Sequence, residues 1–153
     1  MFAPHLHLLI YDKKWTKEGA FRKEEILQAF TKATEILGKN FSHTTVTLAL
    51  SNDAEVQALN KTFRNKDAPT NVLSFPSEEE ESLGDIILAC ETVMKEAETD
   101  RISSRHHTLH LIIHGFLHLL GYDHEKEEEA LQMEGLEIQI LGSLGIANPY
   151  EEI

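Results

Sequence analysis

The stretch His106–Glu125, HHTLHLIIHGFLHLLGYDHE, decides how this chain folds. Between its histidines the segment is apolar on almost every side, which is typical of a helix that is buried all round. A buried imidazole is unfavourable unless it has a polar partner. We therefore expect a central buried helix whose histidines are held by partners.

Two of these histidines have the spacing of metal ligands. His114 and His118 are four residues apart, so their side chains lie one above the other on one helix face. A stripe that also included His110 would extend about 12 Å along the axis at about 1.5 Å per residue, which is too long for zinc–nitrogen bonds of about 2.0–2.1 Å. Gly121 is suited to end the helix and turn the chain, so that His124 returns as a third ligand. The pattern H-x3-H-x5-H predicts one zinc ion per chain on His114, His118 and His124.

The residue after the first ligand separates this site from the zinc peptidases. Those with the motif H-E-x-x-H carry a glutamate there as general base, whereas this chain has Gly115. Three neutral imidazoles leave one position of a tetrahedral zinc ion open for water, as in a catalytic site. The positive charge of such a site suits an anionic substrate such as a phosphodiester. An atypical metalloprotease stays open as an alternative.

The composition limits the classes of function. We expect one domain over residues 1–153, because the chain is long enough for one substantial core. Cys90 is the only cysteine, which excludes an intramolecular disulfide, and the lack of a secretory signal favours a reducing cytoplasm. The sequence contains no apolar run of membrane-spanning length. The net charge of −12 argues against nucleic-acid binding by the whole surface, but not against RNA binding at a local basic group.

Hydrophobic periodicity predicts the element order β-α-β-α-β-β-α-α-α. The expected strands cover residues 5–10, 44–50, 72–75 and 86–89, and the expected helices cover 17–37, a segment capped by Asn52, 91–98, the histidine helix and 125–141. We expect the third and fourth strands to pair antiparallel, because an acidic loop of hairpin type joins them. The predicted fold is α+β, with a small mixed sheet of about four strands and about five helices around the histidine helix. The tail from Gly142 is expected to fray.

The chain resembles the YbeY family of endoribonucleases, also described as rRNA maturation factors. The segment from His114 to His124, HGFLHLLGYDH, matches the family pattern H-G-x-L-H-L-x-G-Y-D-H. Asn60–Pro76 resembles N-x-x-[YF]-R-x-K-D-x-P-T-D-V-L-S-F-P, and Gly84-Asp85-Ile86 matches a shorter G-D-I element. Asn71 departs from the pattern, since the family has aspartate at that position.

The resemblance implies more than the spacing does. It implies zinc on the three histidines, cleavage of single-stranded RNA, maturation of the small-subunit rRNA 3′ end and a part in ribosome quality control. It also implies that Arg64 is functionally needed. The partners to be expected are rRNA, the small ribosomal subunit, ribosomal proteins and a ribosome-associated GTPase, with no membrane involved.

These inferences assign roles to individual residues. Arg64 and His114 are the candidate catalytic residues. The guanidinium of Arg64 can hold a phosphate and offset charge in the transition state; a surface base or an intramolecular salt bridge is the alternative for Arg64. Asp85 and Asp123 are candidates to orient a ligand imidazole, or they cap a turn. A zinc-containing ribosome assembly factor without catalysis is the second alternative function. The candidate RNA-binding residues are Lys61, Arg64 and Lys66.

Overall fold

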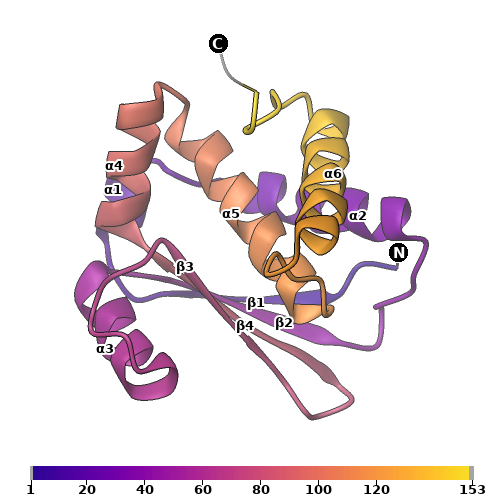
Figure 1. Cartoon of the computed structure of the whole chain (residues 1–153), viewed down its shortest axis with the longest axis horizontal. Helices are drawn as coiled ribbons and strands as arrows, with labels where there is room; N and C mark the ends of the chain where they lie inside the picture. The colour runs from indigo at the N-terminus through magenta and orange to yellow at the C-terminus, as the bar shows by residue number, and fades with distance from the viewer. Residues whose placement is uncertain (1, 152–153) are drawn as a thin grey trace.

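Four strands form one mixed sheet in the computed structural model, which describes residues 2–151 (Figure 1). Within that range the strand order is β1-β2-β4-β3, with β1, β2 and β4 parallel and β3 antiparallel to β4 at one edge. Parallel neighbours need crossover connections, and helices after β1 and β2 supply them. The strands are β1 (His5–Ile10), β2 (Thr45–Ser51), β3 (Val72–Pro76) and β4 (Ser82–Ala89).

Six helices accompany the sheet within residues 2–151. They are α1 (Lys14–Lys17), α2 (Lys23–Leu37), α3 (Asp53–Arg64), α4 (Cys90–Asp100), α5 (Ser104–Leu119) and α6 (Glu127–Ser143). The predicted α+β fold and four-stranded mixed sheet are confirmed, and the antiparallel pairing of β3 with β4 is confirmed as well. In the described part of the chain, no helix combines the length and apolarity that crossing a membrane requires.

The segment after β1 differs from the sequence prediction. The periodicity predicts one helix over 17–37, whereas the chain forms the short α1 and begins α2 only at Lys23. The carboxylate of Asp12 accepts the first N–H of α1 at 2.9 Å. Trp15 is fully buried, and its indole N–H donates to the Ser51 carbonyl at 2.7 Å. This long-range contact fixes α1 at the end of β2, and helical periodicity does not report contacts of that kind.

The histidine-rich helix α5 is the central helix, as its apolar sequence predicts. It lies over β3 and β4 and contacts α2, α4 and α6 (Figure 1). Phe116 is fully buried and packs edge-to-face on Phe30 and Phe41, with ring centroids 5.1 and 5.8 Å away. Aromatic contacts of this geometry stabilise a core beyond the area that they bury. The core around Phe116 therefore fixes the rotation of α5 about its own axis.

Gly115 allows α5 to approach the sheet closely. A Cβ atom at this position would lie 2.9 Å from Cγ2 of Ile86 and 3.0 Å from Oγ of Ser74. The Ser74 hydroxyl donates to the Gly115 carbonyl at 3.2 Å. This close contact fixes the neighbouring His114 next to the edge strand β3.

The two faces of the sheet pack against different helices. In β4, Ile86 and Leu88 belong to the main core beneath α5, whereas Ile87 and Ala89 belong to a smaller cluster with Val56 of α3. This is the alternation expected of a strand that is covered on both faces. Helix α3 therefore covers the face of the sheet opposite to α5 (Figure 1).

Candidate metal centre and substrate cleft

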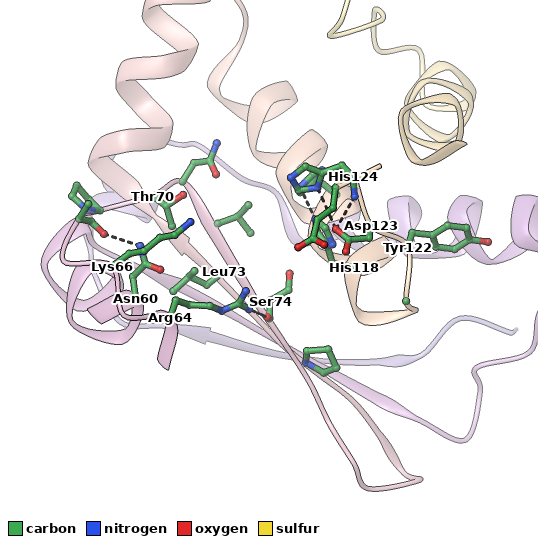
Figure 2. Close-up of a pocket in the computed structure, with 18 residues that line it drawn as sticks. Asn60, Arg64, Lys66, Thr70, Leu73, Ser74, His118, Tyr122, Asp123 and His124 are labelled. Atoms are coloured by element: carbon green, nitrogen blue, oxygen red, sulfur yellow. Dashed lines mark hydrogen bonds and ion pairs between the residues drawn. The ribbon is translucent and has the colours of Figure 1, made fainter. Parts of the chain in front are cut away.

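Three histidines bring their ring nitrogens together at the C-terminal end of α5 (Figure 2). His114 and His118 lie one turn apart, and their Nε2 atoms are 3.1 Å apart. His124 follows in the turn after the helix, and one nitrogen of each ring lies within 4.8 Å of the others. Among residues 2–151, no other group of three or more His, Cys, Asp or Glu side chains meets this condition. The structure thus brings together the three ligands that the spacing predicts.

The chain reversal after α5 places His124. Gly121 has a φ of +99°, in the region that favours glycine. The Tyr122 N–H donates to the Leu117 carbonyl at 3.1 Å, which turns the chain back along the helix. The carboxylate of Asp123 accepts the N–H of His124 at 2.7 Å. These backbone contacts return the third imidazole to the helix end.

The closest pair of donor nitrogens has the spacing of zinc ligands. Zinc–nitrogen bonds of about 2.0–2.1 Å in a tetrahedron separate two donor nitrogens by about 3.3 Å, close to the 3.1 Å between His114 and His118. Burial, together with the nearby imidazoles of His114 and His124, lowers the pKa of His118. The His118 ring is therefore neutral at neutral pH and keeps a lone pair for a metal. Three neutral imidazoles are a ligand set of catalytic zinc sites.

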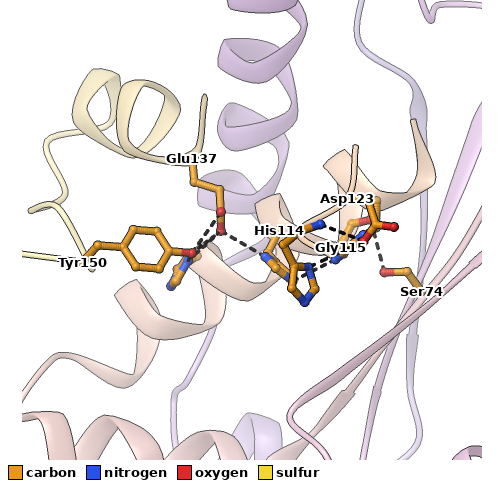
Figure 3. A network of polar contacts seen from close by, with 9 residues as sticks. Ser74, His114, Gly115, Asp123, Glu137 and Tyr150 are labelled. Carbon is orange, nitrogen blue, oxygen red and sulfur yellow. Dashed lines mark hydrogen bonds and ion pairs between the residues drawn. The ribbon is translucent and has the colours of Figure 1, made fainter. Parts of the chain in front are cut away.

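A carboxylate of α6 contacts Nδ1 of His114, whereas Nε2 of that ring lies near His118 (Figure 3). Glu137 of α6 is fully buried, and its Oε1 lies 2.8 Å from Nε2 of His110 and 3.1 Å from Nδ1 of His114. The Tyr150 hydroxyl donates to both oxygens of Glu137, at 3.0 and 2.9 Å. Burial raises the pKa of Glu137, but the hydrogen bonds from His110 and His114 outweigh it and hold the pKa at about 2. At neutral pH Glu137 is therefore an ionised acceptor, and both imidazole nitrogens donate to it.

Sequence reasoning missed this carboxylate. The predictions do not include Glu137, and they expect the tail from Gly142 to fray. Instead, α6 continues to Ser143, and Tyr150 packs back onto Glu137. One signal was available, because Glu137 lies four residues after Met133 on the apolar face of α6. A charge at such a position indicates a buried partner.

The histidines open onto a cleft of about 850 Å³ (Figure 2). Arg64, the last residue of α3, and Lys66 line the other side of it. The Arg64 guanidinium donates to the Ser74 carbonyl at 2.7 Å and lies 5.4 Å from the ring centroid of Phe75. A guanidinium has five N–H donors, so these contacts leave donors available for an anion in the cleft. The cleft thus combines the histidine triad with the positive charges of Arg64 and Lys66.

Two sequence motifs meet in this cleft, and they are those of a known family. The sequence model of that family, described as Endoribonuclease YbeY, matches residues 9–145. This chain belongs to the YbeY endoribonuclease family. The motif beginning at Asn60 supplies Arg64 and Lys66, and the motif from His114 to His124 supplies the triad.

Curated YbeY proteins match this chain at 39–53% identity. The protein of Rhodospirillum rubrum is 53% identical over 117 residues, which cover 70% of this chain and 58% of that protein. The match therefore spans less than two thirds of the R. rubrum protein. The Bradyrhizobium diazoefficiens protein is 39% identical over 160 residues, covering 97% of this chain and 86% of that protein. The Rhodopseudomonas palustris protein is 41% identical over 155 residues, covering 96% and 81%.

A solved structure shares the fold of this YbeY chain. It is the solution structure of a Thermotoga maritima protein, which aligns with a TM-score of 0.58 at 26% sequence identity. The alignment covers 96% of this chain and 99% of the other. The arrangement of sheet and helices is therefore shared along almost the whole length of both chains.

The YbeY motif brings only part of the predicted basic group to the cleft. Arg64 and Lys66 line it, whereas Lys61 is exposed outside it and pairs with Asp67 at 4.0 Å. The buried Asn60 donates its side-chain amide to the Ala68 carbonyl at 2.9 Å, which ties down the loop after α3. This anchored loop fixes Lys66 but does not involve Lys61.

Asp85 and Asp123, the two carboxylates predicted to orient a ligand imidazole, do not hydrogen-bond to the rings of the histidine triad. Asp85 is exposed on the face of β4 opposite to α5, because the next residue, Ile86, faces α5. The structure therefore does not bring Asp85 to the histidines. Asp123 lies 3.9 Å from Nδ1 of His124, beyond hydrogen-bond length, and caps the backbone N–H of that residue instead. Asp123 thus takes the alternative role of a turn cap.

The position that departs from the YbeY pattern belongs to a small polar cluster. The side-chain amide of Asn71 donates to Oε1 of Glu96 at 3.0 Å. Glu96 also contacts Nε2 of the buried His107 at 2.9 Å. An aspartate at position 71 would offer no N–H to Glu96. Asparagine at position 71 therefore provides the hydrogen-bond donor that Glu96 of α4 accepts.

Proposed function

We propose that this chain is a zinc-dependent endoribonuclease that cleaves single-stranded RNA. The observation that carries the proposal is the shared cleft, in which the histidine triad faces Arg64 and Lys66. A cationic metal centre beside a guanidinium suits a phosphodiester. The family and its curated members are described as Endoribonuclease YbeY, which supports the same class of substrate.

The residues of the cleft have two kinds of role, metal binding and stabilisation of the charge on the phosphate. His114, His118 and His124 would hold the ion, and bound zinc would supply Lewis-acid chemistry and lower the pKa of a coordinated water. Arg64 binds the phosphate and offsets the charge that develops on it, which a planar fork of donors does well. Lys66 adds a second positive charge for the RNA backbone.

Gly115 disfavours a peptidase on steric as well as chemical grounds. Zinc peptidases with the motif H-E-x-x-H place their general base at this position. In this chain the position points at Ile86 and Ser74, where even a Cβ atom would be 2.9–3.0 Å from its neighbours. A glutamate there could not be accommodated without moving α5 off the sheet. The metalloprotease alternative therefore loses its catalytic base.

We extend the proposal to maturation of the small-subunit rRNA 3′ end and to ribosome quality control in the cytoplasm. The corresponding partners are the small ribosomal subunit, ribosomal proteins and a ribosome-associated GTPase. The motif resemblance supports these finer assignments.

The variant Arg64→Lys tests the proposed activity. Lysine keeps the positive charge but loses the bidentate fork. We expect Arg64→Lys to bind single-stranded RNA nearly as well as wild type and to cleave it about 10²–10³-fold more slowly, the usual cost of one transition-state contact. The measurement is single-turnover cleavage at saturating enzyme, with the zinc content of each variant determined.

The matched control is Lys61→Ala, because Lys61 lies outside the cleft. Its binding and cleavage should both stay close to wild type. Cleavage by Arg64→Lys at the wild-type rate would make Arg64 an ordinary surface base. Zinc-loaded wild type that associates with small ribosomal subunits but cleaves no RNA would instead support an assembly factor without catalysis.

A further inference from the structure

We infer that Glu137 is a positioning residue, which fixes the tautomer and orientation of the His114 imidazole so that Nε2 faces the metal site. The inference rests on the zinc site proposed above, and it concerns a residue outside both the ligand triad and the cleft lining. Figure 3 shows the carboxylate of Glu137 between His114 on α5 and Tyr150 in the tail.

The two ring nitrogens of His114 have different neighbours. A neutral imidazole has one N–H and one lone pair, and the hydrogen bond made by one nitrogen decides the role of the other. Nδ1 of His114 lies 3.1 Å from Oε1 of Glu137, and a carboxylate only accepts. The proton therefore sits on Nδ1. The lone pair is left on Nε2, the atom that lies 3.1 Å from Nε2 of His118.

The carboxylate is itself held in place. Glu137 has no exposed surface, and two further donors fix its oxygens. Nε2 of His110 is 2.8 Å from Oε1, and the Tyr150 hydroxyl is 2.9 Å from Oε2. A buried carboxylate with all its partners in position cannot rotate away without losing them. His110, which the helix geometry excludes from the ligand set, thus supports the site through Glu137.

A merely structural role would not require this geometry. To join α6 to α5, Glu137 would need only His110. The additional contact at Nδ1 of His114 is directed at the one ring atom that selects the metal-binding nitrogen. Outer partners of this kind orient metal-bound histidines, and their loss typically costs about 10–100-fold in metal affinity.

The test is Glu137→Gln, which keeps the size of the side chain but removes its charge and turns one acceptor into a donor. Zinc affinity, measured by competition with a chelator well below the melting temperature, should fall about 10–100-fold. In the zinc-free variant, nitrogen NMR shifts of His114 should report a mixture of tautomers, against the Nδ1–H form in wild type. The matched control is Glu128→Gln, an exposed residue of the same helix that loses the same charge; its affinity and tautomer should stay at the wild-type values.

Two results would overturn the inference. One is zinc binding by Glu137→Gln within twofold of wild type, with His114 still in the Nδ1–H form. The other is an Nε2–H tautomer of His114 in zinc-free wild type, a measurement that does not depend on whether the variant folds. Wild type that binds no zinc would refute the proposed metal instead, and the wild-type tautomer would still decide the role of Glu137.

Discussion

At the scale of single residues, Gly115 marks the closest approach of α5 to the sheet. Gly115→Ala should lower the free energy of unfolding, because its Cβ would lie 2.9 Å from Ile86 and 3.0 Å from Ser74. Overpacking of a core costs about 1–3 kcal/mol, and the better helix propensity of alanine returns up to about 1 kcal/mol. We expect a net loss of about 1–2 kcal/mol in urea denaturation.

Gly135 in α6 provides the control. A Cβ atom at that position would meet no other atom within 4 Å. Gly135→Ala should therefore leave the stability unchanged or raise it by up to about 1 kcal/mol. Equal effects of the two substitutions would show that the contact of α5 with β3 and β4 is not tight at Gly115.

Some residues of the candidate site could be predicted from the sequence, and others could not. The convergence of His114, His118 and His124 was predictable, because spacing along one helix and a glycine stop are local features. Glu137 has one local signal, its place on the apolar face of α6, but its partners His110 and His114 follow only from the packing of α6 on α5. Asp85 was misplaced for a related reason. Its motif is recognisable, but the face of the strand on which it lies depends on which neighbour, Ile86, enters the core.

At the scale of elements, the histidine triad joins the C-terminal end of α5 to the turn that follows it. Chelation should lower the melting temperature, because a ligand that binds only the native state stabilises it by mass action, by about 2.7 kcal/mol at 100 times its Kd. His124→Ala should lose most of this sensitivity to the chelator. Thermal denaturation with and without chelator, with metal removal verified, provides the measurement.

His43→Ala is the control for that experiment, because His43 is an exposed histidine outside the triad. Its melting temperature should respond to the chelator as that of wild type does. An unchanged melting curve of wild type after complete metal removal would show that the ion does not stabilise the fold.

Elements with strong local signals were predicted, and an element that depends on tertiary contacts was not. Asn52 caps α3 by accepting the Glu55 N–H at 2.9 Å, as its position in the sequence indicates. The four-residue helix α1 carries no periodic signal of its own. It exists where Trp15 is buried at the end of β2, a contact across 36 residues that no local pattern reports.

At the scale of the whole molecule, a net charge of −12 argues that RNA would be drawn to a local basic group, such as the one in the cleft, and not to the whole surface. For single-stranded RNA, each neutralised phosphate contributes about −0.7 to the slope of log K against log salt concentration. With Arg64 and Lys66 as the two bases of the cleft, we expect a slope of log K against log salt of about −1 to −2. Lys66→Ala should flatten this slope by about 0.7.

Lys61→Ala serves as the control for the salt dependence and should leave the slope unchanged. Binding titrations over a range of salt concentrations provide the measurement. A slope several times steeper than expected in wild type would indicate a broad basic surface instead of a local one.

The three histidines are not held with equal firmness, and this difference has a kinetic consequence. His114 and His118 are partly buried on α5, whereas the side chain of His124 is 58% exposed in a turn. We expect the release of a bound ion to begin with the outward swing of this single imidazole, while the helix stays intact. We therefore expect metal exchange to be faster than global unfolding of the chain, so that the identity of the bound ion would follow the supply in the surrounding solution.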